Sequence, residues 1–226
     1  ERETKKIQQV RRTAETVCVD NSCKYLYAAV FDRIMRCDTQ DDRFERTFVV
    51  SSRPGVRISL LATSWNGKYI ASAQSKKPCT IIIWNTLKTN VMCKITYTSG
   101  DIDGMVFSKN RENVIATYQN KGSRGILRLH EFRSKNKIST LRCIIGRKIK
   151  DIVTVGRIIY VLCERSAYVV DDVGSEILLR KRRVLLNDNP QNVSKLFPIS
   201  IAHCNTIFFV LTSWPNVIYD MGVDGR

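Results

Sequence analysis

Long apolar runs are missing from this sequence. None of its apolar stretches approaches the roughly 18 uncharged residues that a membrane-spanning helix needs, and the longest, such as residues 81–84, are only strand-sized. The first residues are charged and have no apolar segment behind them, which is unlike a secretory signal. We therefore expect neither a membrane span nor a secretory signal in this chain.

Residues and motifs that carry catalysis are also scarce. The sequence has two histidines, His130 and His203, which lie far apart in the chain. It contains no glycine-rich phosphate-binding loop and no Gly-x-Ser-x-Gly motif of a hydrolase. Cys204 directly follows His203, but adjacent residues of a strand face opposite sides. We expect no catalytic residue, no cofactor and no metal site, and hence no enzyme.

The eight cysteines are spread along the chain without a Cys-x-x-Cys pair, so the ligand spacing of a structural zinc site is missing. Several lie inside apolar runs, as Cys163 does after residues 158–162. This placement favours buried, reduced thiols in an intracellular protein, either cytoplasmic or nuclear. A secreted, disulfide-bonded domain is the alternative.

Positive charge is what the sequence has in excess. Its 37 lysines and arginines outnumber 21 aspartates and glutamates, which gives a net charge of +16. A positive field of this kind favours acidic partners: RNA, an anionic protein surface or lipid head groups. Charge alone does not choose among them.

Short strand-like segments separated by turns recur from residue 16 to the C-terminus. The clearest copy has strands expected at 58–63, 68–73, 80–85 and 91–96. Asn66 and Gly67 separate its first two strands, and this dipeptide between apolar runs is a strong hairpin signal, because both residue types tolerate positive φ. The copy has the pattern of four antiparallel strands joined by short turns.

The copies recur at a regular interval. Their first strands begin near residues 16, 58, 102, 149 and 196, which are 42, 44, 47 and 47 residues apart. A period of about 40–45 residues is typical of four-stranded propeller blades. The sequence thus predicts an all-β fold, a β-propeller of about five four-stranded antiparallel blades at approximately 15–55, 56–99, 100–146, 147–192 and 193–226, the last one incomplete.

Local motifs add to the period. Residues 64–73, Ser-Trp-Asn-Gly-Lys-Tyr-Ile-Ala-Ser-Ala, resemble the "SPDGKYIASGS" turn and strand of WD-repeat proteins. Residues 81–85, Ile-Ile-Ile-Trp-Asn, are similar to the third strand of that repeat, although Asn85 stands where Asp is usual and the chain has no Gly-His dipeptide. The resemblance implies structural roles for Gly67, Trp84 and Asn85, with Trp84 packed between blades.

Five blades are fewer than the six to eight that are common in this family. In one arrangement the basic N-terminal segment 1–14 closes the ring, with residues 5–12 pairing as the missing outer strand of the last blade. In the other, the chain is part of a longer propeller. The charges of segment 1–14 equally suit a short helix or a linker. Both arrangements remain open at this point.

Two groups of residues are candidates for partner binding. Trp65 and Trp214 precede turn residues, so each is expected at a propeller face, where tryptophan is a good interface anchor. The densest basic cluster, which would contact acidic groups, is Arg180, Lys181, Arg182 and Arg183. Both groups also fit solvated turns and strand edges.

These features together favour a non-catalytic scaffold that mediates protein–protein interaction within a multi-subunit complex. The alternative is an RNA-associated component of ribonucleoprotein assembly that binds through its basic surface. The basic clusters lack the interleaved aromatic residues of a base-stacking surface, which favours a protein partner.

Overall fold

The computed structural model describes residues 14–41, 44–49, 56–75, 78–98, 100–133, 138–163, 166–173, 176–180, 198–204, 207–212 and 218–222. For residues 44–46, 166 and those from 171 onward it describes the backbone alone. Residues 1–13, which make up most of the segment expected to close the ring or act as a linker, lie outside this part. Within it, no helix is long and apolar enough to cross a membrane.

Nineteen β-strands make up the described elements, and they form five separate antiparallel sheets. The first sheet contains β1 (Thr16–Val19), β2 (Tyr25–Val30), β3 (Arg33–Asp38) and β4 (Phe44–Val49). The second contains β5 (Ile58–Thr63), β6 (Tyr69–Gln74), β7 (Cys79–Asn85) and β8 (Val91–Tyr97). The four strands of this second sheet begin within one residue of their predicted starts.

The remaining sheets follow the same order. The third contains β9 (Gly104–Phe107), β10 (Val114–Lys121), β11 (Arg124–Phe132) and β12 (Ile138–Ile145). The fourth contains β13 (Ile149–Val155), β14 (Ile158–Cys163), β15 (Ser166–Val173) and β16 (Glu176–Arg180). The fifth has three strands, β17 (Pro198–Cys204), β18 (Ile207–Thr212) and β19 (Ile218–Gly222).

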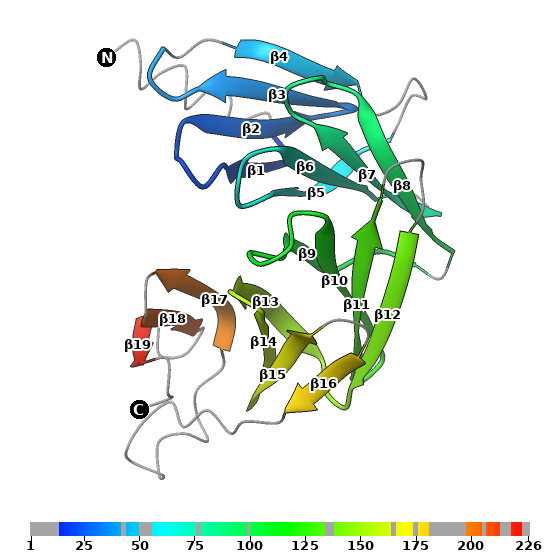
Figure 1. Ribbon diagram of the computed structural model, residues 1–226, viewed down its shortest axis with the longest axis vertical. Coiled ribbons are helices and arrows are strands. Elements are labelled where there is room, and N and C mark those ends of the chain that lie inside the picture. The colour runs from blue at the N-terminus through cyan, green and yellow to red at the C-terminus, as the bar shows by residue number, and fades with distance from the viewer. Residues whose placement is uncertain are drawn as a thin grey trace.

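The sheets are stacked as the blades of a propeller. The first strand of each sheet contacts the first strand of the next, from β1 through β5, β9 and β13 to β17. Figure 1 shows the sheets following one another around an arc, with these first strands on the inner side and the last strands outside. The all-β propeller of four-stranded antiparallel blades is therefore confirmed, and the sheets are called blades below.

Apolar side chains on both faces of the middle strands hold neighbouring blades together. In β7, Ile82 belongs to the core shared with the first blade, whereas Ile81 and Ile83 belong to the core shared with the third. Trp84 is buried against Phe48 of the first blade, with ring centroids 5.8 Å apart. This two-sided burial is the reason that the sequence reads as continuous apolar runs.

The cysteines are free wherever their side chains are described. Four of them are buried, namely Cys37, Cys79, Cys93 and Cys163, and burial raises the pKa of the Cys93 thiol to about 12. Cys23 differs from the expectation of burial, because it lies exposed in the turn between β1 and β2. Its position in a tight turn leaves its side chain no strand face to pack on.

Candidate partner-binding surface

The turn between β5 and β6 is shaped by its own side chains. The backbone N–H of Gly67 donates to the carbonyl of Ser64 at 2.9 Å, and Gly67 alone of the Asn-Gly pair adopts positive φ, at 68°. The hairpin that the Asn-Gly dipeptide predicts is present, since β5 and β6 pair antiparallel on either side of it. Asn66 accepts two hydrogen bonds at Oδ1, from Ser64 Oγ at 2.9 Å and the Lys68 backbone N–H at 3.1 Å. The Asn66 side chain thus adds two hydrogen bonds to the backbone hydrogen bond that closes the turn.

The turn between β7 and β8 lies beside this first turn. Asn85 ends β7, and its Oδ1 accepts hydrogen bonds from the backbone N–H groups of Leu87 at 3.0 Å and Lys88 at 2.8 Å. Thr86 Oγ1 donates to the carbonyl of Gly67 at 2.7 Å, which joins the two turns of the second blade. Leu87 is 72% exposed at the tip.

The turn between β9 and β10 in the third blade is built in the same way. Ser108 Oγ accepts hydrogen bonds from the backbone N–H groups of Asn110 and Arg111, both at 3.2 Å. Asn113 Nδ2 donates to the carbonyl of Phe132 at 3.3 Å, which fixes the turn to the end of β11. Hydroxyl and amide side chains therefore set the shape of this turn as well.

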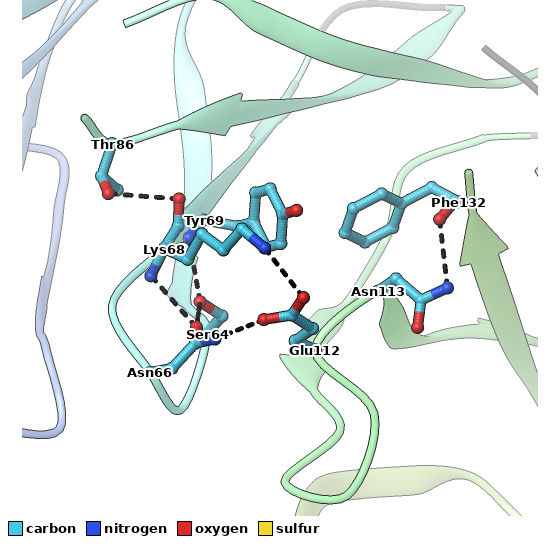
Figure 2. A network of polar contacts seen from close by, with 8 residues as sticks. All are labelled: Ser64, Asn66, Lys68, Tyr69, Thr86, Glu112, Asn113 and Phe132. Atoms are coloured by element: carbon cyan, nitrogen blue, oxygen red, sulfur yellow. Dashed lines mark hydrogen bonds and ion pairs between the residues drawn. The ribbon is translucent and has the colours of Figure 1, made fainter. Parts of the chain in front are cut away.

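Glu112 connects the turns of the two blades. Its Oε1 lies 2.9 Å from Nζ of Lys68, and its Oε2 accepts a hydrogen bond from Nδ2 of Asn66 (Figure 2). These hydrogen bonds, with Lys68 contributing most, hold the pKa of Glu112 below its ordinary value. The hydrogen bonds of Lys68 to Glu112 and Tyr69 raise the pKa of the lysine.

Trp65 stands at the edge of this network. It is 49% exposed, and Nζ of Lys109 lies 4.5 Å from its ring centroid, within cation–π range. One blade thus supplies the indole and the next supplies the cation above it. We call six exposed or half-buried residues of these three turns the turn surface: Trp65, Asn66, Lys68, Leu87, Lys109 and Glu112.

The structure brings together some of the residues predicted from the sequence. Trp65 lies on the turn surface. Gly67 and Asn85 determine the shapes of the β5–β6 and β7–β8 turns that form part of this surface. Arg180 ends β16, where only the backbone is described. The rest of the predicted partner-binding set lies outside the described residues: Lys181, Arg182, Arg183 and Trp214.

Sequence reasoning missed Leu87, Lys109 and Glu112. A signal for Glu112 was present, because it follows Lys68 by 44 residues and so stands one repeat interval further along the chain. Side chains in equivalent turns of stacked blades are neighbours. Contacts between blades can therefore be predicted by aligning each turn of one copy with the same turn of the next copy.

His130 lies in the core rather than on this surface. It is 2% exposed, its Nδ1 is 2.9 Å from Thr140 Oγ1, and its Nε2 is hydrogen-bonded to the hydroxyl of Tyr97. Burial, and then the charge of Arg128, lower the pKa of His130 from 6.5 to about 4. Among the described residues, no group of three or more His, Cys, Asp and Glu side chains is placed to hold a metal ion.

In the comparisons with known proteins, the chain matches solved structures only. No protein-family model matches the chain, and no curated protein matches it. The Myceliophteria thermophila Cps50 (Swd1) beta-propeller domain is similar, with a TM-score of 0.65, 12% identity, and 89% of this chain and 63% of that chain covered. A chain of the Mitotic Checkpoint Complex has a TM-score of 0.64 and 8% identity, with 92% and 60% covered.

The chain spans less than two thirds of the length of these two structures. At such low identity the likeness establishes the fold: this chain is a β-propeller similar to the propeller of Cps50 (Swd1).

Proposed function

We propose that this chain is a non-catalytic scaffold that binds a protein partner through the turn surface. The observation that carries the proposal is the half-exposed indole of Trp65, held at the junction of two blades beneath Lys109. A tryptophan offers a large contact area and has few rotatable bonds to order on binding, which makes it a favourable interface anchor. Leu87, 72% exposed at the tip of the β7–β8 turn, adds apolar area to the turn surface.

The turns around Trp65 are held rigid before any partner binds. Ser64, Asn66 and Asn85 close their own turns by side-chain hydrogen bonds, and Glu112 joins the second blade to the third. Ordering flexible side chains and loops on binding costs free energy. A preorganised surface therefore binds a partner more tightly than a flexible surface that makes the same contacts. These turns meet that requirement.

We place the scaffold inside the cell, in a multi-subunit assembly. One structurally similar chain comes from the Mitotic Checkpoint Complex, which supports this placement by analogy. The free cysteines of the described part also fit a reducing compartment. The net charge of +16 favours a partner that is acidic.

Site-specific photo-crosslinking in cells that express the protein tests the proposal. The photoreactive residue p-benzoylphenylalanine is placed at position 65, and in a matched control at position 31. Phe31 is 65% exposed in the turn between β2 and β3, which leaves its sheet at the opposite end from the β5–β6 turn. We expect position 65 to cross-link a discrete protein that survives ribonuclease treatment, with a yield several-fold above that of position 31.

A second variant separates the turn surface from the chain as a whole. Lys109→Glu, combined with the photoreactive residue at position 65, removes the cation above that position and reverses the local charge, so the cross-linking yield at position 65 should fall several-fold. Cross-links to RNA at position 65, or equal protein yields at positions 65 and 31, would contradict the proposed function. RNA cross-links there would support the ribonucleoprotein alternative.

A further inference from the structure

A cavity of about 380 Å³ is lined in part by Arg111 of the β9–β10 turn, the turn whose Lys109 lies over Trp65. Its floor is apolar and comes from Val114 of β10, Leu129 of β11 and Leu141 of β12. Leu129 and Leu141 are opposite each other in the pairing of β11 with β12, so they present one continuous patch. Leu129 also belongs to the core shared with the fourth blade, so the cavity opens on the blade face turned toward that blade.

The rim of the cavity is polar and mainly positive. Arg111 comes from the β9–β10 turn, Arg133 follows β11, and Glu131 lies near the end of β11. Nη2 of Arg133 lies 3.3 Å from Oε1 of Glu131, and Nδ2 of Asn113 donates to the same oxygen at 3.4 Å. Among the described lining residues, the rim thus carries two guanidinium groups and one carboxylate, which also accepts a hydrogen bond from the Asn113 amide. Arg133 has 68% of its side chain exposed.

The size and lining of this cavity define the chemistry that fits it. A volume of about 380 Å³ lies at the lower end of the range of ligand sites and accommodates a side chain with part of a peptide backbone. The apolar floor favours an aliphatic side chain, and the guanidinium groups favour a carboxylate next to it. The described lining contains no aromatic ring on which a nucleotide base would stack.

We propose that the cavity binds an acidic peptide segment of the partner. One aliphatic side chain sits on Val114, Leu129 and Leu141, and a neighbouring carboxylate pairs with Arg111 and Arg133. The inference rests on the proposed scaffold function and adds the chemistry of the partner. Arg111 directly precedes Glu112, so the cavity and the turn surface share one turn, and a single extended segment reaches both.

A peptide array tests this assignment with the whole chain. The array combines one leucine, isoleucine or methionine at each position with aspartate and glutamate at the others, and a matched array replaces the acids by asparagine and glutamine. We expect acidic peptides with one aliphatic residue to bind, and their neutral counterparts to bind at least about tenfold more weakly, as measured by fluorescence polarisation. Absence of binding to every acidic peptide overturns the inference.

Three variants locate the binding. Ser139→Trp fills the cavity from an exposed position of β12 and should abolish peptide binding. The double change Arg111→Glu with Arg133→Glu should weaken peptide binding about tenfold or more. The double change Lys121→Glu with Arg124→Glu makes the same charge change at the strand ends that flank the β10–β11 turn, at the opposite end of the sheet, and should leave peptide binding unchanged. Circular dichroism of each variant verifies the fold.

The outcomes separate this inference from the proposed function. If position 65 cross-links a protein while no acidic peptide binds, or if Ser139→Trp leaves peptide affinity unchanged, the cavity assignment is wrong and the scaffold stands. If neither cross-linking nor peptide binding occurs, both are wrong. The peptide assignment is also overturned if the acidic peptides do not bind while a polyuridine oligonucleotide does, and if Ser139→Trp abolishes the binding of that oligonucleotide.

Discussion

Trp84 and His130 occupy the same position in two successive blades. Each lies in the third strand of its blade and reaches a hydroxyl of the second strand: Trp84 Nε1 is 3.4 Å from Ser72 Oγ, and His130 Nε2 is 3.2 Å from Thr117 Oγ1. The strand pairing is also the same, because Trp84 pairs with Ile70 and His130 with Ile115, two residues before the hydroxyl in each case.

Both side chains also meet an aromatic ring of the preceding blade edge-on. Trp84 contacts Phe48 of β4, and His130 contacts Tyr97 of β8 with ring centroids 5.6 Å apart. The third blade therefore keeps the packing role of the tryptophan while replacing its indole by an imidazole. That replacement puts a titratable group into the junction between blades.

Replacing Trp84 by alanine should destabilise the chain strongly. The change removes the contact with Phe48 and the hydrogen bond to Ser72 and leaves a cavity between two blades, at a cost of about 3–5 kcal/mol. Urea unfolding followed by circular dichroism measures this loss. Leu87→Ala, at the exposed tip of the neighbouring turn, should change the free energy of unfolding by less than about 0.5 kcal/mol, and equal effects of the two changes would contradict the packing role.

His130 should make stability depend on pH. Its pKa is about 4 in the folded chain against an ordinary 6.5, so the unfolded chain binds more protons between these values. The free energy of unfolding therefore falls as pH is lowered from 6.5 to about 4. At about 1.4 kcal/mol per pH unit, the contribution of His130 amounts to about 3 kcal/mol.

Urea unfolding across this pH range measures the effect of His130. The variant His130→Gln keeps a polar side chain that does not titrate, so its stability should fall less steeply than that of the unmodified chain. Carboxylates titrate in both proteins and cancel in the comparison. Parallel pH profiles for the two proteins would show that His130 is not the titrating group.

Gly125→Ala should disturb the junction of the third and fourth blades. A Cβ atom at Gly125 would lie 2.7 Å from Cδ1 of Ile149 and 2.9 Å from the carbonyl oxygen of Arg147. We expect a loss of about 1–3 kcal/mol, because the backbone oxygen cannot move aside as a flexible side chain would. Gly146→Ala is the matched control, since no atom lies within 4 Å of its added Cβ. Thermal unfolding should separate the two variants, and an unaffected Gly125→Ala would contradict the close approach.

Lys68→Met should change the titration of Glu112 more than it changes stability. The two side chains are 42% and 46% exposed, so loss of their ion pair should cost less than about 1 kcal/mol. Without its main hydrogen-bond donor, the carboxyl pKa of Glu112 should rise toward its ordinary value. A side-chain carbon NMR titration measures this pKa, and an unchanged value would show that Lys68 does not control it.

Much of the fold could be predicted because its signals are local. The strands of the second blade are predicted by apolar runs between turn residues. The repeat interval is predicted because each copy consists of four such strands in succession. Gly67 adopts positive φ as its residue type allows. The geometry of the turn at Asn66 could not be predicted, since the same dipeptide serves several turn geometries and the side-chain hydrogen bonds to Ser64 and Lys68 select one of them.

The sequence by itself determined the strands, their order within each blade and the burial of both faces of β7, because hydrogen-bonded hairpins and alternating side chains depend on residues close together in the chain. The stacking of blades decided the rest. Lys109 over Trp65, Glu112 against Lys68 and Tyr97 against His130 each join residues more than 30 positions apart. Such neighbours, and the cavity beside Leu129, exist only once the apolar faces of successive sheets have been packed together and removed from water.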